Sequence, residues 1–304
     1  MIHNRITTAL LLAAGTGSRL HPLTLDAPKC LTEVGGEPML GRLVGNLRLQ
    51  GIKRLVVVTG YLDHRIREFL QNNAADLQVD YVFNPVYKTT NNIYSLWLAR
   101  EIIDEPFILI ESDLVFEESL LEAMLTPDKI AISNILPWMN GTVVEINNEE
   151  AVTAFHVGHN VNDALLYKTV NIYSLSLQSW HRAIERLDRF IADGRVGEYY
   201  EIVFADMVAD STIVFDAVFF DENKWYEIDT MLDLQQAELM FPSTSLVASA
   251  VCRLGPLQNI RVSENNSMAV PSHYSGKNSN SPAEDVKTVV PLNKRLASDT
   301  VPLS

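Results

Sequence analysis

Two glycines and two cations lie close together near the start of this 304-residue chain. The apolar run of residues 6–14 breaks at Gly15–Gly17, and Arg19 and Lys29 follow shortly after. Glycines behind a strand let the backbone come close to a phosphate chain, because no side chain stands in the way. Two cations beside such a loop suit a triphosphate, whose leaving group gains negative charge during transfer. The segment therefore favours phosphoryl or nucleotidyl transfer.

Other loops with glycine pairs fit this segment less well. A dinucleotide-binding loop has a third glycine, and an acidic residue ends its second strand, whereas the second predicted strand here ends in Thr59–Tyr61. A Walker loop needs Gly-Lys-Ser/Thr, which the segment lacks. An ordinary tight turn would explain the glycine pair alone equally well, so the cations beside it carry the argument.

Carboxylates end two predicted strands far from this loop. Asp113 closes the run 107–113, and Asp229 closes the run 224–229. Two carboxylates at strand ends that face one cleft would hold Mg²⁺ through oxygen ligands. Glu227 precedes Asp229 by two positions and so shares its face of an extended strand, which makes it a third candidate ligand. A turn cap or a surface charge would explain Glu227 equally well.

Alternating strands and helices must position these residues. The predicted strands cover residues 6–14, 54–60, 77–84 and 107–113, and predicted helices cover 38–51, 63–71 and 91–103. Such alternation predicts right-handed βαβ units on a parallel sheet, with the ligand beyond the carboxyl ends of the strands. We therefore expect an α/β fold, a Rossmann-like, mostly parallel mixed sheet flanked by helices.

The second half of the chain changes character. Short strand-like runs between residues 129 and 175 predict the end of the sheet and a small mixed β subregion. Helices at 176–193, 198–209 and 231–240 and strands at 212–220 and 224–229 complete a domain of residues 1–243. Residues 244–304 are rich in Ser, Asn and Pro, which predicts a disordered, flexible tail or linker.

Composition excludes several classes of protein. The formal net charge of −14 argues against binding to nucleic acid or to anionic lipid. No segment has the ~18 uninterrupted apolar residues of a membrane helix, so we expect a cytoplasmic protein without membrane insertion. Cys30 and Cys252 form no metal-type or redox-type pair. The sequence leaves the oligomeric state open.

The glycine-rich segment resembles a known family. Residues 12–31, LAAGTGSRLHPLTLDAPKCL, are similar to the nucleotidyltransferase signature Gly-x-Gly-x-Arg … Pro-Lys. Enzymes of that superfamily join a nucleoside triphosphate to a phosphorylated small molecule and release pyrophosphate. The stretches ESDLVF (111–116) and WYEIDTMLDLQQAE (225–238) resemble the segments whose aspartates hold Mg²⁺. The resemblance thus implies Mg²⁺ as cofactor, with Asp113 and Asp229 as its ligands.

The resemblance also implies which residues contact the nucleotide. Arg19 and Lys29 are the expected catalytic cations, and the base is expected against the backbone of Leu12–Ala14. The full set of expected nucleotide contacts is Leu12, Ala13, Ala14, Gly15, Thr16 and Gly17. One departure is that Glu111 and Ser112 stand where relatives often carry Gly-Asp or an acid-small-Asp triplet.

Three further stretches resemble one branch of the superfamily. These are NNIYSLWLA (91–99), YKTVNIYSLS (167–176) and GEYYEIV (197–203). They are similar to enzymes that use CTP with phosphocholine or 2-aminoethylphosphonate. The first two stretches resemble the 2-aminoethylphosphonate group more closely, which slightly favours that acceptor.

The amine of such an acceptor needs its own pocket. Aromatic faces hold a quaternary ammonium, whereas a primary ammonium prefers carboxylate and carbonyl oxygens. The candidate acceptor-binding residues are Trp138, Lys168, Tyr199, Tyr200, Glu201 and Glu111. Among them, Lys168 is the candidate for the phosphoryl oxygens, and core packing is a competing explanation for each aromatic residue.

These features together predict a Mg²⁺-dependent cytidylyltransferase. An oxygen of the acceptor phosphate or phosphonate, already ionised near neutral pH, would attack the α-phosphorus of CTP and release pyrophosphate. Catalysis would then be positioning and charge stabilisation, without a strong base. Two alternatives stay open, a sugar-1-phosphate nucleotidyltransferase that makes a UDP- or dTDP-sugar and an inactive nucleotide-binding or regulatory domain. The sequence does not separate cytosine from uracil.

Overall fold

The computed structural model describes residues 5–158 and 166–243. All of them fall within the first of two units into which the chain divides, Met1–Gly255. The tail predicted for residues 244–304 lies outside the described residues, so that prediction and the boundary at 243 stay predictions.

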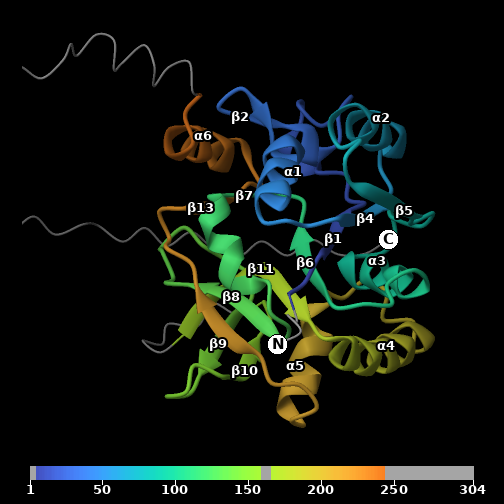
Figure 1. Ribbon diagram of the computed structural model, residues 1–304, viewed down its shortest axis with the longest axis vertical. Helices are drawn as coiled ribbons and strands as arrows, with labels where there is room; N and C mark the ends of the chain where they lie inside the picture. Colours follow the sequence, from blue (N-terminus) through green and yellow to red (C-terminus); the bar gives the residue numbers. More distant parts are fainter. Residues whose placement is uncertain (1–4, 159–165, 244–304) are drawn as a thin grey trace, which may run out of the picture. The chain divides into compact units, whose positions relative to one another are not determined.

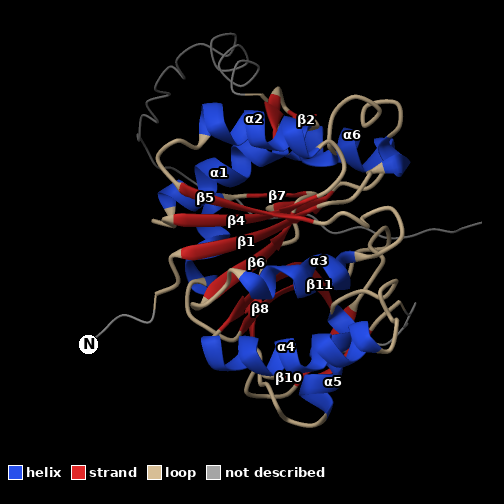
Figure 2. Ribbon diagram, turned by 90° about the vertical axis from the view of Figure 1, so that its right-hand side faces the viewer, coloured by secondary structure: helices blue, strands red, loops and turns tan. Residues whose placement is uncertain are grey.

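A nine-stranded mixed sheet forms the middle layer (Figure 2). Its strands are β1 (Thr8–Ala13), β4 (Arg54–Thr59), β5 (Gln78–Phe83), β6 (Phe107–Glu111), β8 (Lys129–Ser133), β9 (Val143–Ile146), β10 (Val152–His156), β11 (Leu166–Leu175) and β12 (Asp216–Phe219). The main path runs β10-β9-β11-β6-β1-β4-β5, with β8 between β11 and β12. β1 pairs in parallel with β4 and β6, whereas β11 runs antiparallel to β6, β8 and β9. The predicted fold class is confirmed.

Helices cover both faces of this sheet. They are α1 (Met39–Leu49), α2 (Asp63–Asn73), α3 (Asn92–Leu98), α4 (Leu177–Ala192), α5 (Glu201–Ala209) and α6 (Met231–Met240). Leu11 of β1 packs in one core cluster with α1 and α2, and its neighbour Leu12 packs in another with α3, α4 and α5. Because β1 is buried on both faces, its sequence is a continuous apolar run rather than an alternating one.

Two small sheets lie beside the large one. β2 (Glu33–Val34) pairs with β3 (Glu37–Pro38), and β7 (Leu114–Phe116) pairs antiparallel with β13 (Trp225–Glu227). Figure 1 shows α6 next to β2, so segments from opposite ends of the described chain lie side by side, joined by a third apolar cluster. The sequence did not predict β7, because a three-residue strand carries no readable period.

Two predicted strands end earlier than expected. β6 stops at Glu111 and β13 stops at Glu227, so Asp113 and Asp229 lie in the turns that follow. The reason is that the chain leaves the large sheet after Glu111 and enters β7 at Leu114, which leaves a polar turn between them. Glu227 and Asp229 therefore do not share a strand face, and that part of the argument for a third metal ligand is wrong.

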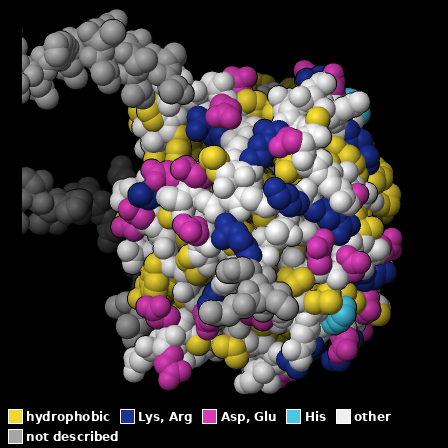
Figure 3. Space-filling view, in the orientation of Figure 1, with side chains coloured by type: hydrophobic (Ala, Val, Ile, Leu, Met, Phe, Trp, Pro, Cys, Tyr) yellow, Lys and Arg dark blue, Asp and Glu magenta, His cyan; other side chains and the backbone are white. Residues whose placement is uncertain are grey.

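Two expectations from composition, on membrane insertion and on charge, concern the surface of the protein. No helix in the described part of the chain is long and apolar enough to cross a membrane. On the face shown in Figure 3, basic and acidic side chains are interspersed. The expectation from net charge that the protein does not bind nucleic acid stays a prediction.

Gly60, directly after β4, packs closely against Ala14, the residue before the glycine loop. A Cβ at Gly60 would lie 2.7 Å from the carbonyl oxygen of Ala14 and 2.8 Å from the Cβ of Tyr87. We expect Gly60→Ala to lower the free energy of unfolding by roughly 1–3 kcal/mol, as overpacking does. Urea denaturation measures this. Gly45→Ala, in α1, is the control, since a Cβ there meets no atom within 4 Å and should stabilise by about 0.5–1 kcal/mol. Equal stability of Gly60→Ala and the parent chain would contradict the close contact.

Candidate active site

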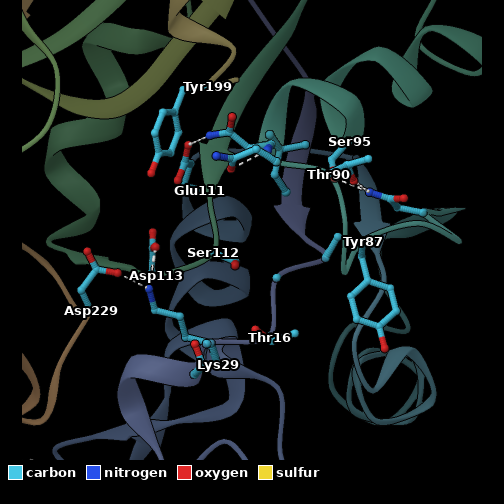
Figure 4. A pocket seen from close by; sticks show the side chains of 18 of the residues that line it. Thr16, Lys29, Tyr87, Thr90, Ser95, Glu111, Ser112, Asp113, Tyr199 and Asp229 are labelled. Carbon is cyan, nitrogen blue, oxygen red and sulfur yellow. Dashed lines mark hydrogen bonds and ion pairs between the residues drawn. The ribbon is translucent and has the colours of Figure 1, made fainter. Parts of the chain in front are cut away.

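A cavity of about 300 Å³ gathers residues from the two distant motifs. It is lined by Leu12, Ala14, Gly15, Thr16, Gly17, Ser18, Arg19, Lys29, Asn84, Tyr87, Thr90, Asn91, Asn92, Ser95, Glu111, Ser112, Asp113, Tyr199 and Asp229. Figure 4 shows Lys29 between Asp113 and Asp229 at one end of this cavity and Tyr87 on another side. The structure thus brings the glycine loop, both cations and both aspartates together, at the carboxyl ends of β1 and β6.

Gly17 couples the glycine loop to Lys29. Its φ of 62° is a left-handed conformation, which glycine adopts without strain. A Cβ at this position would lie 2.9 Å from the Cβ of Lys29, so the lysine stem passes directly over the loop. The hydroxyl of Thr24 donates to the carbonyl oxygen of Gly17 at 2.8 Å and holds the turn. The glycine is therefore required both by backbone conformation and by the position of the cation.

Lys29 bridges the two aspartates. Its Nζ lies 2.8 Å from Oδ2 of Asp113 and 2.7 Å from Oδ1 of Asp229, and all three side chains are largely buried. Burial alone would lower the pKa of Lys29, but the charges of the two carboxylates outweigh it and raise that pKa. Arg19, which is mostly exposed, adds a second contact to Oδ1 of Asp229 at 2.7 Å. Despite its burial, Asp229 has a lowered pKa because both cations are close.

Short backbone contacts hold the aspartates in place. The β7–β13 pairing puts Glu227 opposite Leu114, and the amide of Ile228 donates to the carbonyl oxygen of Asp113 at 2.9 Å. The next helix, α6, begins with a capping box between Thr230 and Asp233. The carboxylate of Asp233 also accepts from the amide of Asp229 at 3.1 Å. Two segments more than a hundred residues apart are thereby fixed against each other.

The chemistry of this pair suits a hard divalent cation. Oδ1 of Asp113 is buried and has no hydrogen-bond partner, which leaves an oxygen of the kind that Mg²⁺ prefers. Glu227 instead faces Lys168 and Asn171, at 3.4 Å each. Within residues 5–158 and 166–243, no three or more His, Cys, Asp or Glu side chains form a metal-holding group. The free carboxylate oxygen of Asp113, with Asp229 close by, fits the ion. The full set of metal ligands stays a prediction.

Sequence reasoning missed several polar residues that line this cavity. Leu12 and Ala14 line it as expected, whereas Ala13 packs into the core beneath. The buried amide of Asn84 donates to Thr90 and Ser95, at 3.2 and 3.1 Å, and the cavity is lined by all three. The position of Asn84 could have indicated its place in the cavity, because it is a polar residue directly after β5, at the same sheet edge as the glycine loop.

A second cavity of about 320 Å³ adjoins the first. It is lined by Arg19, Asn92, Glu111, Asp113, Asn140, Gly141, Thr142, Val157, Gly158, Lys168, Asn171, Tyr199, Glu201, Glu227 and Asp229. Four candidate acceptor residues, Glu111, Lys168, Tyr199 and Glu201, are among them. Lys168 and Glu201 are almost fully buried, and Nζ of Lys168 donates to the carbonyl oxygen of Thr169 at 2.7 Å. Whether these residues bind an acceptor stays a prediction.

Two aromatic candidates lie outside the second cavity. Tyr200 is fully buried and packs against Tyr173 and Phe204, so it belongs to the core. Trp138 stacks on Tyr226 with ring centroids 4.3 Å apart and lines a third cavity of about 480 Å³. Arg19, Glu227 and Asp229 border both this third cavity and the second. Tyr199 is therefore the one aromatic side chain among the described residues that line the second cavity.

The acids of the second cavity are held close together. Burial raises the pKa of Glu111, and the nearby negative charges of Asp113, Glu201 and Glu227 raise it further. Burial likewise raises the pKa of Glu201 to about 7 and the pKa of Glu227 above its ordinary value. The raised pKa values favour the protonated, neutral form of these acids in the empty cavity, and a cationic ligand placed among them would stabilise their ionised form.

An unusual backbone conformation aims Asn171 at these acids. Its φ of 60° is left-handed, and the pairing of β11 with β8 shifts register between Thr169 and Tyr173. A bulge of this kind re-aims a side chain, and here it directs the buried amide of Asn171 toward Glu227. No pattern in the sequence indicates this bulge, because the only residue preference at its left-handed position is a tolerance for Asn.

Comparisons with known proteins place this chain beside a family of transferases. Residues 8–134 match the family model described as nucleotidyl transferase. The CMP-5'-(3-aminopropyl)phosphonate synthase of Streptomyces rubellomurinus is 33% identical over 244 residues, which are 77% of this chain but 38% of that protein. The choline-phosphate cytidylyltransferase of Streptococcus pneumoniae is 25% identical over 235 residues, which are 76% of this chain and 96% of that protein.

Two further similarities cover a shorter segment and the fold. The 2-aminoethylphosphonate cytidylyltransferase of Lancefieldella rimae is 34% identical over 113 residues, 37% of this chain and 45% of that protein. The solved structure of the CTP:phosphocholine cytidylyltransferase from Streptococcus pneumoniae has a TM-score of 0.68 at 22% identity. It covers 78% of this chain and 99% of that chain, and it shows that the fold is shared.

The position of Lys29 predicts competition with a divalent cation. In Lys29→Met, both aspartates lose their shared counter-charge, so a metal ion should bind between them more easily. We expect Mn²⁺ to bind this variant about tenfold or more tightly than the parent chain without nucleotide, as measured by titration with electron paramagnetic resonance. Lys224→Met is the control, because that amine contacts Glu117 and lies outside the three cavities. Equal affinities in all three proteins would contradict the competition.

The raised pKa of Glu201 predicts a pH dependence of stability. The folded protein keeps the proton on this carboxyl up to about pH 7, whereas the unfolded chain loses it near the ordinary value of 4.5. The free energy of unfolding should therefore fall between these two pH values and stay low above them. Glu201→Gln should gain stability relative to the parent chain by a few kcal/mol between about pH 4.5 and 8, at roughly 1.4 kcal/mol per pKa unit. Urea denaturation at about pH 4.5 and pH 8 measures this difference. Glu238 is exposed, so the free energy of unfolding of Glu238→Gln should change with pH as that of the parent chain does.

Proposed function

Because the chain belongs to the nucleotidyltransferase superfamily, with the family model matching residues 8–134, we propose that it transfers CMP from CTP to a small aminoalkyl phosphonate or phosphate. Pyrophosphate is the second product. Cytidylyl transfer is supported by the activities for which the similar proteins are named, which include CMP-phosphonate and choline-phosphate enzymes. The chain spans 38% of the first of these relatives, so the proposal rests on this chain's own residues.

The first cavity supplies positioning and positive charge for this reaction. The glycine loop cradles the triphosphate, and Lys29 and Arg19 stabilise the charge that develops on the α-phosphoryl group and on pyrophosphate. Asp113 and Asp229 would hold Mg²⁺, and the ion would supply further neutralisation of phosphate charge. An acceptor oxygen is already ionised near neutral pH, so the site needs no strong general base. The absence of histidine from the described lining of the first cavity is consistent with this.

The second cavity favours a primary ammonium over a quaternary one. Glu111, Glu201 and Glu227 offer carboxylate oxygens, and Asn171 offers an amide, whereas Tyr199 is the one aromatic side chain among the described lining residues. A primary ammonium donates three hydrogen bonds and gains from such oxygens. A quaternary ammonium donates none and relies on several aromatic faces. This carboxylate-rich lining is the observation that carries the choice of 2-aminoethylphosphonate over phosphocholine.

An acceptor panel with CTP and Mg²⁺ tests the proposal. Pyrophosphate release should be observed with 2-aminoethylphosphonate, with kcat/KM at least about tenfold above that for phosphocholine, a difference of roughly 1.4 kcal/mol. The reason is that a quaternary ammonium leaves the carboxylates without hydrogen-bond donors. Asp113→Ala should lower turnover by about 10²-fold or more.

Other outcomes of the panel would overturn the proposal. Turnover of glucose-1-phosphate with UTP or dTTP, without turnover of aminoalkyl acceptors, would indicate a sugar nucleotidyltransferase. CTP binding without pyrophosphate release with any acceptor would indicate an inactive nucleotide-binding domain. Full turnover in Asp113→Ala would contradict the metal assignment.

A further inference from the structure

Asn92, the first residue of α3, connects three segments that are distant in sequence. Its Nδ2 donates to Oε1 of Glu111 at 3.0 Å, and its Oδ1 accepts from the backbone amide of Tyr200 at 2.9 Å. Both cavities are lined by Asn92. Figure 4 shows Glu111 beside Tyr199 at one end of the first cavity, away from Lys29. The amide of Asn92 therefore sits where the two cavities meet.

The contact to Tyr200 fixes the start of α5. Tyr200 is the N-cap of this helix, and Glu201 is its first residue. Glu201 is 4% exposed as a residue and lines the second cavity. Neighbouring Asn91 adds a further contact, because its backbone N–H donates to the carbonyl oxygen of Val196 at 2.9 Å. The start of α3 thus holds the backbone from which Glu201 projects.

An asparagine is suited to this position because one planar group both donates and accepts. The donor holds a carboxylate oxygen of Glu111, and the acceptor satisfies a backbone amide next to Glu201. Alanine would remove both contacts. Aspartate would keep an acceptor for the amide of Tyr200 but would replace the donor with a second negative charge beside Glu111. The two substitutions therefore separate the support of α5 from the orientation of Glu111.

We propose that Asn92 is a positioning residue. It holds Glu111 and Glu201, the two carboxylates that bind the acceptor's ammonium group, at a fixed place relative to the α-phosphoryl group of the nucleotide. It thereby determines which chain length of aminoalkyl phosphonate is accepted. The inference rests on the proposed function, since it assigns the ammonium to these carboxylates. With Asn92 in place, the span from the carboxylates to Lys29 is fixed, and an acceptor one methylene longer or shorter places its oxygen wrongly for attack.

Steady-state kinetics with 2-aminoethylphosphonate and 3-aminopropylphosphonate test the inference. We expect Asn92→Ala to raise the acceptor KM for the preferred chain length about 30-fold and to change the KM for CTP less than about threefold. The ratio of kcat/KM between the two chain lengths should fall toward one. Asn92→Asp should also raise the acceptor KM while unfolding at a temperature close to that of the parent chain, because the amide of Tyr200 keeps its acceptor.

A matched control separates positioning from general destabilisation. Asn46 in α1 donates its side-chain amide to the carbonyl oxygen of Phe116 at 2.9 Å and lies outside the three cavities. Asn46→Ala should lower the unfolding temperature without changing chain-length selectivity. A double-mutant cycle of Asn92→Ala with Glu111→Gln adds a second measurement, and the two effects on acceptor KM should be strongly non-additive.

These results distinguish a failure of this inference from a failure of the proposed function. If the parent chain turns over neither phosphonate, the proposed function fails and the role of Asn92 fails with it. If the parent chain turns over one of them, and Asn92→Ala and Asn92→Asp keep its acceptor KM and selectivity, only the role of Asn92 is overturned. Additive effects in the double-mutant cycle would likewise overturn it.

Discussion

Lys29 places one positive charge between Asp113 and Asp229, two carboxylates that would otherwise repel each other in a largely buried position. Three segments of the chain meet at this charge: the glycine loop, the turn after β6 and the turn after β13. Removing one member of such a buried cluster leaves an uncompensated charge, which costs more than the intact interaction contributes. The rest of the site is arranged around it, and the missing side chain of Gly17 leaves room for the lysine stem.

The sequence predicted those parts of the fold that produce long periodic patterns. Strands β1, β4 and β6 and the helix between Pro38 and Gly51 all lie near their predicted bounds. A strand buried on both faces is a continuous apolar run, and a helix buried on one face repeats apolar residues at helical spacing, so both patterns can be recognised in the sequence. The β7–β13 pairing was not readable, since each strand has three residues. This pairing nevertheless brings Asp113 and Asp229 together, so the sequence placed both at strand ends without showing how they meet.

The acceptor side shows a second limit of sequence reasoning. Tyr199 and Tyr200 are adjacent and chemically identical, yet one lines the cavity and the other is fully buried in the core. Trp138 was an equally reasonable candidate, but it stacks on Tyr226 in a neighbouring cavity. A sequence lists which aromatics are available, whereas the packing of α5 against β11 decides which of them a ligand meets. The amides of buried Asn171 and half-buried Asn92 escape notice for the same reason, since their roles depend on partners from other elements.

Charge segregation across the two cavities also orients an acceptor. Lys168, the candidate for the phosphoryl oxygens, donates to Thr169 and lies 3.4 Å from Glu227, so much of its charge serves to balance the acids around it. Phosphonate oxygens placed among those acids would be repelled, whereas Lys29 and Arg19 offer positive charge at the other end. An aminoalkyl phosphonate is a dipolar ion whose ends match this separation, with the ammonium among the carboxylates and the anionic oxygens toward the cations. The same field that selects the ligand would therefore also point its reactive oxygen at the nucleotide.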